Sequence, residues 1–156
     1  MSEKTAPAVN TAPNTAVTLF SQYGNYMTLM VAAVATIGSL YFSEIRNFIP
    51  CELCWYQRIL MYPLVIMSIV GIVKKDEYLP NYVLPFSIVG MFVSTYHYGL
   101  QLGLWGDPGA CSGGIACSAR YINIGGFITI PLMALTAFTL ITIIMGITYW
   151  ANKQAE

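Results

Sequence analysis

"FITIPLMALTAFTLITIIMGITYW", residues 127–150, is a long run of the sequence without a single charged side chain. A helix that crosses the hydrocarbon core of a bilayer, roughly 30 Å thick, needs about 20 mainly apolar residues. Residues 26–42, 55–73 and 82–104 are comparable apolar segments. We therefore predict an all-α membrane protein that folds as a four-transmembrane-helix bundle.

The composition of the 156-residue chain agrees with this prediction. Hydrophobic residues make up 56% of the chain and charged residues only 9%, whereas soluble domains carry about 25% charged residues. The formal net charge is zero, so the chain lacks the basic surface that nucleic-acid binding requires. The composition thus predicts one integral membrane domain and argues against nucleic-acid binding.

Four spans place the loops 43–54 and 105–126 on one side of the membrane. The loop 74–81 and both termini then lie on the other side. All the lysines belong to the side of the termini and all the arginines to the opposite side. The side of the termini therefore has a small excess of positive charges, which favours cytoplasmic termini because cytoplasmic loops carry more Lys and Arg. We predict a bundle in the cytoplasmic membrane with two extracytoplasmic loops, which together carry the four cysteines.

The two ends of the chain are polar. Residues 1–25 are rich in Thr, Ala, Pro and Asn, and they lack the basic start and the apolar core of a cleaved signal peptide. We expect a flexible cytoplasmic tail over residues 1–25, a transmembrane domain over residues 26–150 and a cytoplasmic C-terminal tail over residues 151–156.

The segment "PCELCWYQR", residues 50–58, leads from the first loop into the second predicted helix. Cys51 precedes the helix and Cys54 opens it, where the positive end of the helix dipole stabilises a thiolate. The C-x-x-C spacing is typical of thioredoxin-like redox sites. Arg58 lies one turn deeper on the face of Cys54 and is a candidate cation for the thiolate and a second negative group. A side chain that snorkels to the headgroups is the alternative.

A second cysteine pair, Cys111 and Cys117, lies in the glycine-rich loop "WGDPGACSGGIACSAR". Its disulfide is either a staple for the loop or a bond suited to thiol–disulfide exchange with another protein. Two pairs on one side suggest an electron relay, in which partner thiols reduce the loop pair and the helix-mouth pair reoxidises it. Because the sequence has no haem or flavin motif, we expect a lipid-soluble quinone as the acceptor.

His97 is the one histidine of the chain. Counted along the third span at 1.5 Å per residue, it lies in the outer third of the membrane, at a depth similar to that of Arg58. It is a candidate donor to a quinone oxygen. The alternative is a polar side chain that is satisfied within the helix bundle.

Two other interpretations of the cysteines stay open on the residues alone. Cys51 and Cys54 could form a purely structural disulfide. All four cysteines could instead bind zinc, which would make the protein a non-enzymatic membrane scaffold or a metal sensor. Two features count against zinc: the spacing between Cys111 and Cys117 is wide for zinc ligands, and a zinc site would give Arg58 no role.

"CELCWYQR" and the second cysteine pair before the last span resemble the DsbB family of membrane thiol–quinone oxidoreductases, and most of all its short-looped branch called BdbC. The resemblance runs from the first span to the fourth. It implies that the protein is an enzyme and that it folds as a four-helix bundle with both ends in the cytosol. Such an enzyme reoxidises an extracytoplasmic thioredoxin-fold thiol oxidase of the DsbA or BdbD type and passes the electrons to menaquinone or ubiquinone.

The resemblance also implies roles for the site residues. Cys111 would take the mixed disulfide with the partner, and Cys117 would then exchange with Cys51. Cys54 would react with the quinone beside Arg58.

His97 resembles a histidine of the family's third span that lies near the quinone. One departure is that only five residues separate the loop cysteines, so the family's account of how Cys117 reaches Cys51 does not carry over. A relay that runs in the reductive direction, as in relatives of vitamin K epoxide reductase, is a further alternative. Those proteins place the C-x-x-C later in the chain.

Overall fold

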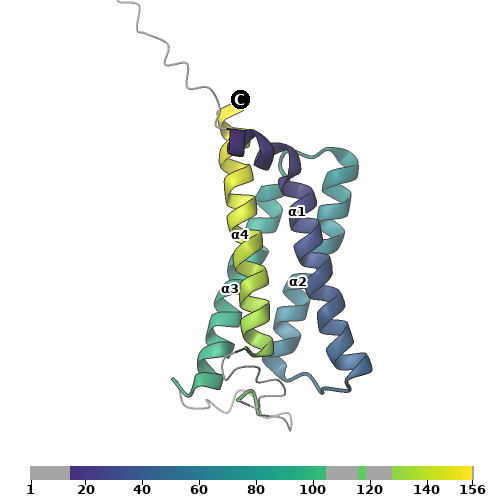
Figure 1. Cartoon of the computed structure of the whole chain (residues 1–156), viewed down its shortest axis with the longest axis vertical. Coiled ribbons are helices and arrows are strands. Elements are labelled where there is room, and N and C mark those ends of the chain that lie inside the picture. The colour runs from purple at the N-terminus through teal and green to yellow at the C-terminus, as the bar shows by residue number, and fades with distance from the viewer. Residues whose placement is uncertain (1–14, 105–115, 119–127, 156) are drawn as a thin grey trace, which may run out of the picture.

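The computed structural model describes residues 15–104, 116–118 and 128–155, and this part of the chain is helical apart from short connections (Figure 1). The elements are α1 (Thr15–Leu40), which continues into the π-helical turn η1 (Tyr41–Ile45), then α2 (Glu52–Lys74), α3 (Leu79–Leu102) and α4 (Ile130–Ala155). Four helical segments are long and apolar enough to cross a membrane: Tyr23–Ile45, Glu52–Lys74, Leu79–Leu102 and Ile130–Lys153. The predicted four-helix membrane bundle is confirmed.

The helices extend beyond the apolar runs that predicted them. Helix α2 begins at Glu52 rather than at residue 55, and a carboxylate in the first turn stabilises a helix start. Helix α4 continues past residue 150 into the segment expected as a C-terminal tail. Helix α1 begins at Thr15, inside the segment expected as an N-terminal tail, whereas residues 1–14 lie outside the described residues.

Helices that follow one another in sequence are neighbours in space, and α4 closes the ring by packing against α1. Helices α2 and α4 lie diagonally and meet only slightly. The start of α1 and the end of α4 lie at one end of the bundle, and the connection between α1 and α2 lies at the other (Figure 1). The start of α2 therefore shares its end of the molecule with the end of α3.

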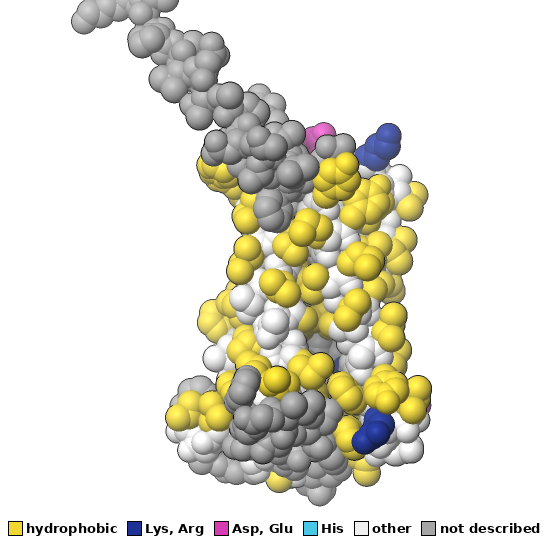
Figure 2. Space-filling view, in the orientation of Figure 1, with side chains coloured by type: hydrophobic (Ala, Val, Ile, Leu, Met, Phe, Trp, Pro, Cys, Tyr) yellow, Lys and Arg dark blue, Asp and Glu magenta, His cyan; other side chains and the backbone are white. Residues whose placement is uncertain are grey.

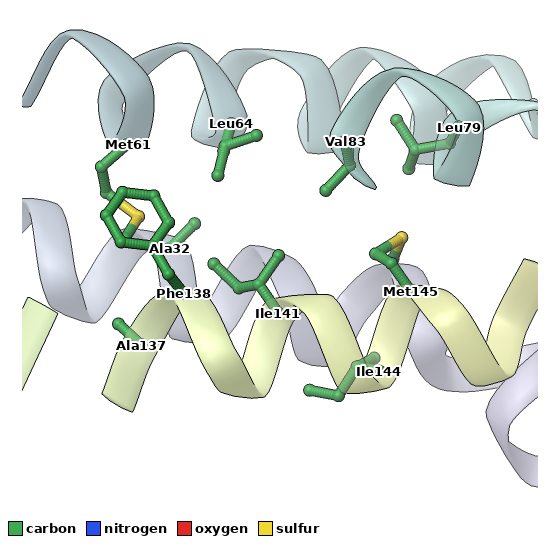
Figure 3. Close-up of a cluster of buried hydrophobic side chains, with 10 residues drawn as sticks. All are labelled: Ala32, Met61, Leu64, Leu79, Val83, Ala137, Phe138, Ile141, Ile144 and Met145. Carbon is green, nitrogen blue, oxygen red and sulfur yellow. The ribbon is translucent and has the colours of Figure 1, made fainter. Parts of the chain in front are cut away.

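The core lies in the middle of the bundle and combines side chains from all four helices (Figure 3). Its buried members are Ala32, Met61, Leu64, Leu79, Val83, Ala137, Phe138, Ile141, Ile144 and Met145. Gly90 of α3 allows the ring of Phe138 to lie against its backbone, because a Cβ atom at Gly90 would overlap that ring. Small residues of this kind let membrane helices approach closely.

The outer surface of the bundle is apolar over most of its length (Figure 2). Val34, Ile66 and Phe92 are each about two-thirds exposed. A water-soluble protein rarely leaves so many large apolar side chains in one continuous surface. This surface suits the hydrocarbon of a bilayer and agrees with a multi-pass membrane protein.

Candidate functional site

Two free thiols lie at the first turn of α2. Cys51 is the residue before the helix, with an extended backbone (φ −73°, ψ 171°), and its carbonyl accepts a hydrogen bond from the Trp55 amide at 3.2 Å. Cys54 follows within the first helical turn, and the two sulfur atoms are 3.1 Å apart. Both cysteines are free in this structure; Cys51 is buried and Cys54 half-buried. The structure therefore describes the pair in its dithiol state.

Cys117 lies against the Cys51 side of this pair. It is only 1% exposed, and it forms one buried cluster with Cys51 and Leu100. Cys117 is in a disulfide bond, whereas Cys111 lies outside the described residues. The structure thus brings together three of the four predicted cysteines and puts one sulfur of a disulfide beside a free dithiol.

His97 lies between the two cysteine-bearing segments and is 1% exposed. Its Nε2 is 3.6 Å from the Cys51 sulfur and 3.2 Å from the backbone carbonyl oxygen of Cys117. Its Nδ1 is 3.2 Å from Nε2 of Gln57. The ring of His97 therefore contacts Cys51, Cys117 and Gln57.

Gln57 is a site residue that the sequence reasoning missed. It is 5% exposed although it lies on an apolar helix. Two signals could have found it. A polar side chain inside a membrane span is costly and therefore points to a functional position, and Gln57 follows Cys54 by three residues, which is the spacing of neighbours on one helix face.

The surroundings of Cys51 favour its thiolate. A hydrogen bond with the Cys54 thiol is the largest cause and lowers the pKa of Cys51 below its usual range. Burial of the Cys51 sulfur opposes this shift, and the contact with His97 lowers the pKa of Cys51 further. A thiol with a lowered pKa is a better leaving group in thiol–disulfide exchange.

A cavity of about 540 Å³ lies on the other side of the pair, between α1, α2 and α4. Most of its lining is apolar. The polar side chains around its end nearest the cysteines come mainly from the start of α2 and the end of α1: Ser39, Cys54, Gln57, Arg58 and Tyr62. His97 is not among the lining residues. The cavity has the size and polarity of a pocket for an apolar small molecule.

The cavity opens toward the side of the bundle. Met30 and Val34 of α1 and Met133 of α4 line it, and each of these side chains is also well exposed on the outer surface. The face that carries α1 and α4 shows a furrow between the two helices (Figure 2). A lipid-soluble molecule can therefore enter from the region that hydrocarbon would surround.

Arg58 lies at the wall of this cavity, one turn after Cys54. Its Nη2 donates a hydrogen bond to the Ser39 carbonyl at 3.2 Å, and its guanidinium lies 5.7 Å from the ring centre of Trp55. The Tyr62 hydroxyl donates to the Ser39 side chain at 3.5 Å. A guanidinium has five N–H donors, so this anchoring leaves donors for a group in the cavity.

Metal binding has one candidate donor set in the described part of the chain. The ligand atoms of Cys51, Cys54 and His97 all lie within 4.8 Å of one another. The four-cysteine zinc site considered from the sequence is a different set, and it needs thiolates at all four positions. The disulfide at Cys117 is incompatible with that site in this redox state.

Comparison with known proteins gives consistent matches over most of the chain. The model of the family described as "Disulfide bond formation protein DsbB" matches residues 22–148. Disulfide bond formation protein C of Bacillus subtilis is 54% identical over 122 residues, which cover 77% of this chain and 88% of that protein. A probable disulfide formation protein C of Halalkalibacterium halodurans is 50% identical over 121 residues, covering 77% and 86%. No solved structure matches.

Proposed function

We propose a function from one premise: the chain belongs to the DsbB family of disulfide bond formation proteins. It is a multi-pass membrane protein with a role in disulfide bond formation. We propose further that it is a thiol–quinone oxidoreductase. In this proposal it reoxidises an extracytoplasmic thioredoxin-fold thiol oxidase of the DsbA or BdbD type and delivers the electrons to menaquinone or ubiquinone.

One observation carries the proposal: the two thiols at the start of α2 have different neighbours. The Cys51 sulfur lies in a buried cluster with Cys117, while Cys54 lines the cavity together with Arg58. A relay needs such an arrangement, because one sulfur must meet the incoming disulfide partner and the other must meet the electron acceptor.

The proposed exchange steps balance without any outside reagent. Partner thiolate attacks the Cys111 sulfur of a Cys111–Cys117 disulfide, and the electron pair leaves on Cys117. The Cys117 thiolate then attacks Cys51 in a Cys51–Cys54 disulfide, and Cys54 leaves as a thiolate. Each step breaks one S–S bond and forms one, so the oxidising equivalents move outward while electrons move toward the cavity.

The second thiolate of the partner completes the oxidation of the partner. It attacks the partner's own sulfur in the mixed disulfide, which releases the oxidised partner and the Cys111 thiolate. The Cys111 thiolate regenerates the Cys111–Cys117 disulfide and releases Cys51. Cys51 and Cys54 are then the dithiol that this structure describes.

The cavity residues fit a quinone. An apolar lining suits a quinone ring and its hydrocarbon tail, and the Arg58 guanidinium suits a carbonyl oxygen. When bound, a quinone accepts the two electrons and two protons that the dithiol loses on forming its disulfide. The chain contributes a thiol at the cavity wall, a fixed cation beside it and a lining that excludes water.

We place the cysteine end of the bundle outside the cell and both termini in the cytoplasm. The relay supports this placement, because disulfides form and persist in extracytoplasmic compartments. The separation of the lysines from the cysteines in sequence supports it as well.

The test is quinone reduction by the purified full-length chain, driven by a reduced thioredoxin-fold oxidase. We expect stoichiometric oxidation of the partner and reduction of the quinone. Cys54→Ser is the matched inactive variant, since it removes the sulfur at the cavity but leaves the loop pair. If the wild-type chain exchanges thiols with the partner but reduces no quinone, the proposed acceptor is wrong.

A further inference from the structure

The network around His97 contains one group that can only accept a hydrogen bond. This group is the backbone carbonyl oxygen of Cys117, 3.2 Å from His97 Nε2. A carbonyl oxygen has no proton to donate. The short contact is favourable only if Nε2 carries a hydrogen, so the carbonyl of Cys117 decides which ring nitrogen is protonated.

The second ring nitrogen has a matching partner. In a neutral imidazole with a proton on Nε2, Nδ1 is an acceptor and needs a donor. The side-chain amide nitrogen of Gln57, 3.2 Å away, is that donor. The amide in the opposite orientation would set its oxygen against the Nδ1 lone pair, so the carbonyl of Cys117 also fixes the orientation of the Gln57 amide.

Both side chains of this network are buried, which makes the pairing costly to break. His97 is 1% and Gln57 5% exposed. A buried polar atom that loses its partner keeps the full cost of desolvation. The amide donor at Gln57 therefore acts against a ring flip and against transfer of the proton to Nδ1.

The Nε2 hydrogen faces two groups that must meet in the proposed relay. It points to the carbonyl of Cys117, and the Cys51 sulfur is 3.6 Å from the same nitrogen. The ring thus joins the backbone of one reacting cysteine to the sulfur of the other. This contact explains how Cys117 is held beside Cys51 even though few residues separate the loop cysteines.

We propose that Gln57 is a positioning residue that keeps the His97 proton on Nε2, so that His97 holds the Cys117 backbone against the Cys51 sulfur for disulfide exchange. The inference rests on the proposed function, since it concerns the exchange step of that relay. When a thiolate attacks Cys117 in a Cys51–Cys117 disulfide, the S–S bond breaks and its electron pair leaves on Cys51. The Cys51 sulfur, on which that charge develops, lies 3.6 Å from His97 Nε2, so the ring that holds Cys117 also adjoins the leaving group.

The single histidine makes the proton position directly measurable. In the full-length chain with histidine that carries ¹⁵N only in its ring, purified without a histidine tag, NMR reports only the two ring nitrogens of His97. We expect a protonated Nε2 and an unprotonated Nδ1 in the dithiol state. A wild-type spectrum with the proton on Nδ1 would overturn the inference, whatever any variant does.

Two substitutions separate positioning from simple packing. Gln57→Leu keeps the volume of the side chain but removes the hydrogen-bond donor. We then expect a mixture of rings protonated on Nε2 and rings protonated on Nδ1. Exchange between Cys117 and Cys51 should slow roughly tenfold, which is the effect of one lost hydrogen bond. Gln57→Glu supplies an acceptor for an Nδ1 hydrogen, so both ring nitrogens should be protonated. Since Nε2 keeps its hydrogen, Gln57→Glu should exchange faster than Gln57→Leu.

Ser87→Ala is the matched control, because it also removes a partly buried hydrogen bond between helices, the one from Thr142 Oγ1 at 3.0 Å. Ser87 lies about 15 Å from His97 along α3, and its loss should leave the spectrum and the exchange rate unchanged. If Gln57→Leu matches the wild type in both, Gln57 has no positioning role. A failed quinone assay with the expected spectrum and exchange rates would count against the proposed acceptor and leave this inference standing.

Discussion

Replacement of Arg58 is the sharpest test of how the cavity works. Arg58 is held at the cavity wall by the Ser39 carbonyl and by the ring of Trp55, in a lining that is otherwise largely apolar. Negative charge develops on a quinone oxygen as it accepts electrons. In a low-dielectric site, a fixed donor aimed at that oxygen is worth more than in water.

The magnitude follows from the bond that is lost. A hydrogen bond to a charged group contributes about 1.5–3 kcal/mol, which corresponds to roughly ten- to a hundredfold in rate. We expect Arg58→Ala to slow quinone reduction on this scale and to leave exchange with the partner nearly unchanged. Arg58→Lys should recover part of the rate, because it keeps the charge but loses the planar fork of donors.

The assay measures quinone reduction against quinone concentration, beside single-turnover exchange with the thiol partner. Arg46→Ala is the control, since Arg46 is an exposed arginine at the same end of the bundle that lies against Phe48 and does not line the cavity. Wild-type quinone kinetics in Arg58→Ala would refute the reasoning. The arginine would then be an anchor that reaches the headgroups.

Further predictions concern orientation, order of exchange, ionisation and packing. An impermeant thiol reagent applied to reduced intact cells should label the loop cysteines; labelling that requires permeabilised cells would contradict the proposed orientation. Cys117→Ser should trap the covalent complex with the partner and Cys111→Ser should abolish it, and the reverse pattern on a non-reducing gel would exchange the two roles. The rate at which Cys51 is alkylated in the dithiol state is proportional to the fraction of Cys51 that is a thiolate. The lowered pKa of Cys51 should therefore keep this rate high as the pH falls below the ordinary thiol pKa near 8.5. Peptide mapping would show a tenfold loss per pH unit from that range if the pKa were not lowered. Gly90→Ala should lower the free energy of unfolding by about 1–3 kcal/mol because its methyl meets an aromatic ring, whereas Gly38→Ala, with open space around its Cβ position, should be close to neutral in a thermal unfolding assay.

The sequence predicts the fold well because a membrane span has a length requirement that apolar runs reveal directly. All four spans follow from it. The ends of the helices were less predictable, since helices continue into polar residues where the apolar run stops. Glu52 at the start of α2 and Lys153 near the end of α4 are such residues.

For the candidate site, the sequence predicted the level of each residue along its helix axis but not the direction in which its side chain points. Counting residues predicted that Arg58 and His97 lie at similar levels along their helices, because helical rise is constant. The rotation of a helix about its axis was not readable, since an apolar helix surrounded by lipid and other helices carries little amphipathic signal. For this reason the cavity between α1, α2 and α4, and the pairing of His97 with Gln57, required the structure.

Because the cavity opens sideways, the lipid sets the effective concentration of any compound that binds in it. A compound that enters through the furrow between α1 and α4 reaches the site from the bilayer, so its relevant concentration is the mole fraction in the lipid. At a fixed total amount of compound, added lipid or detergent should dilute it and raise the apparent inhibition constant in proportion. Ranking of inhibitors then requires their partition coefficients, because a weak binder that concentrates in the bilayer can outperform a tight binder that stays in water.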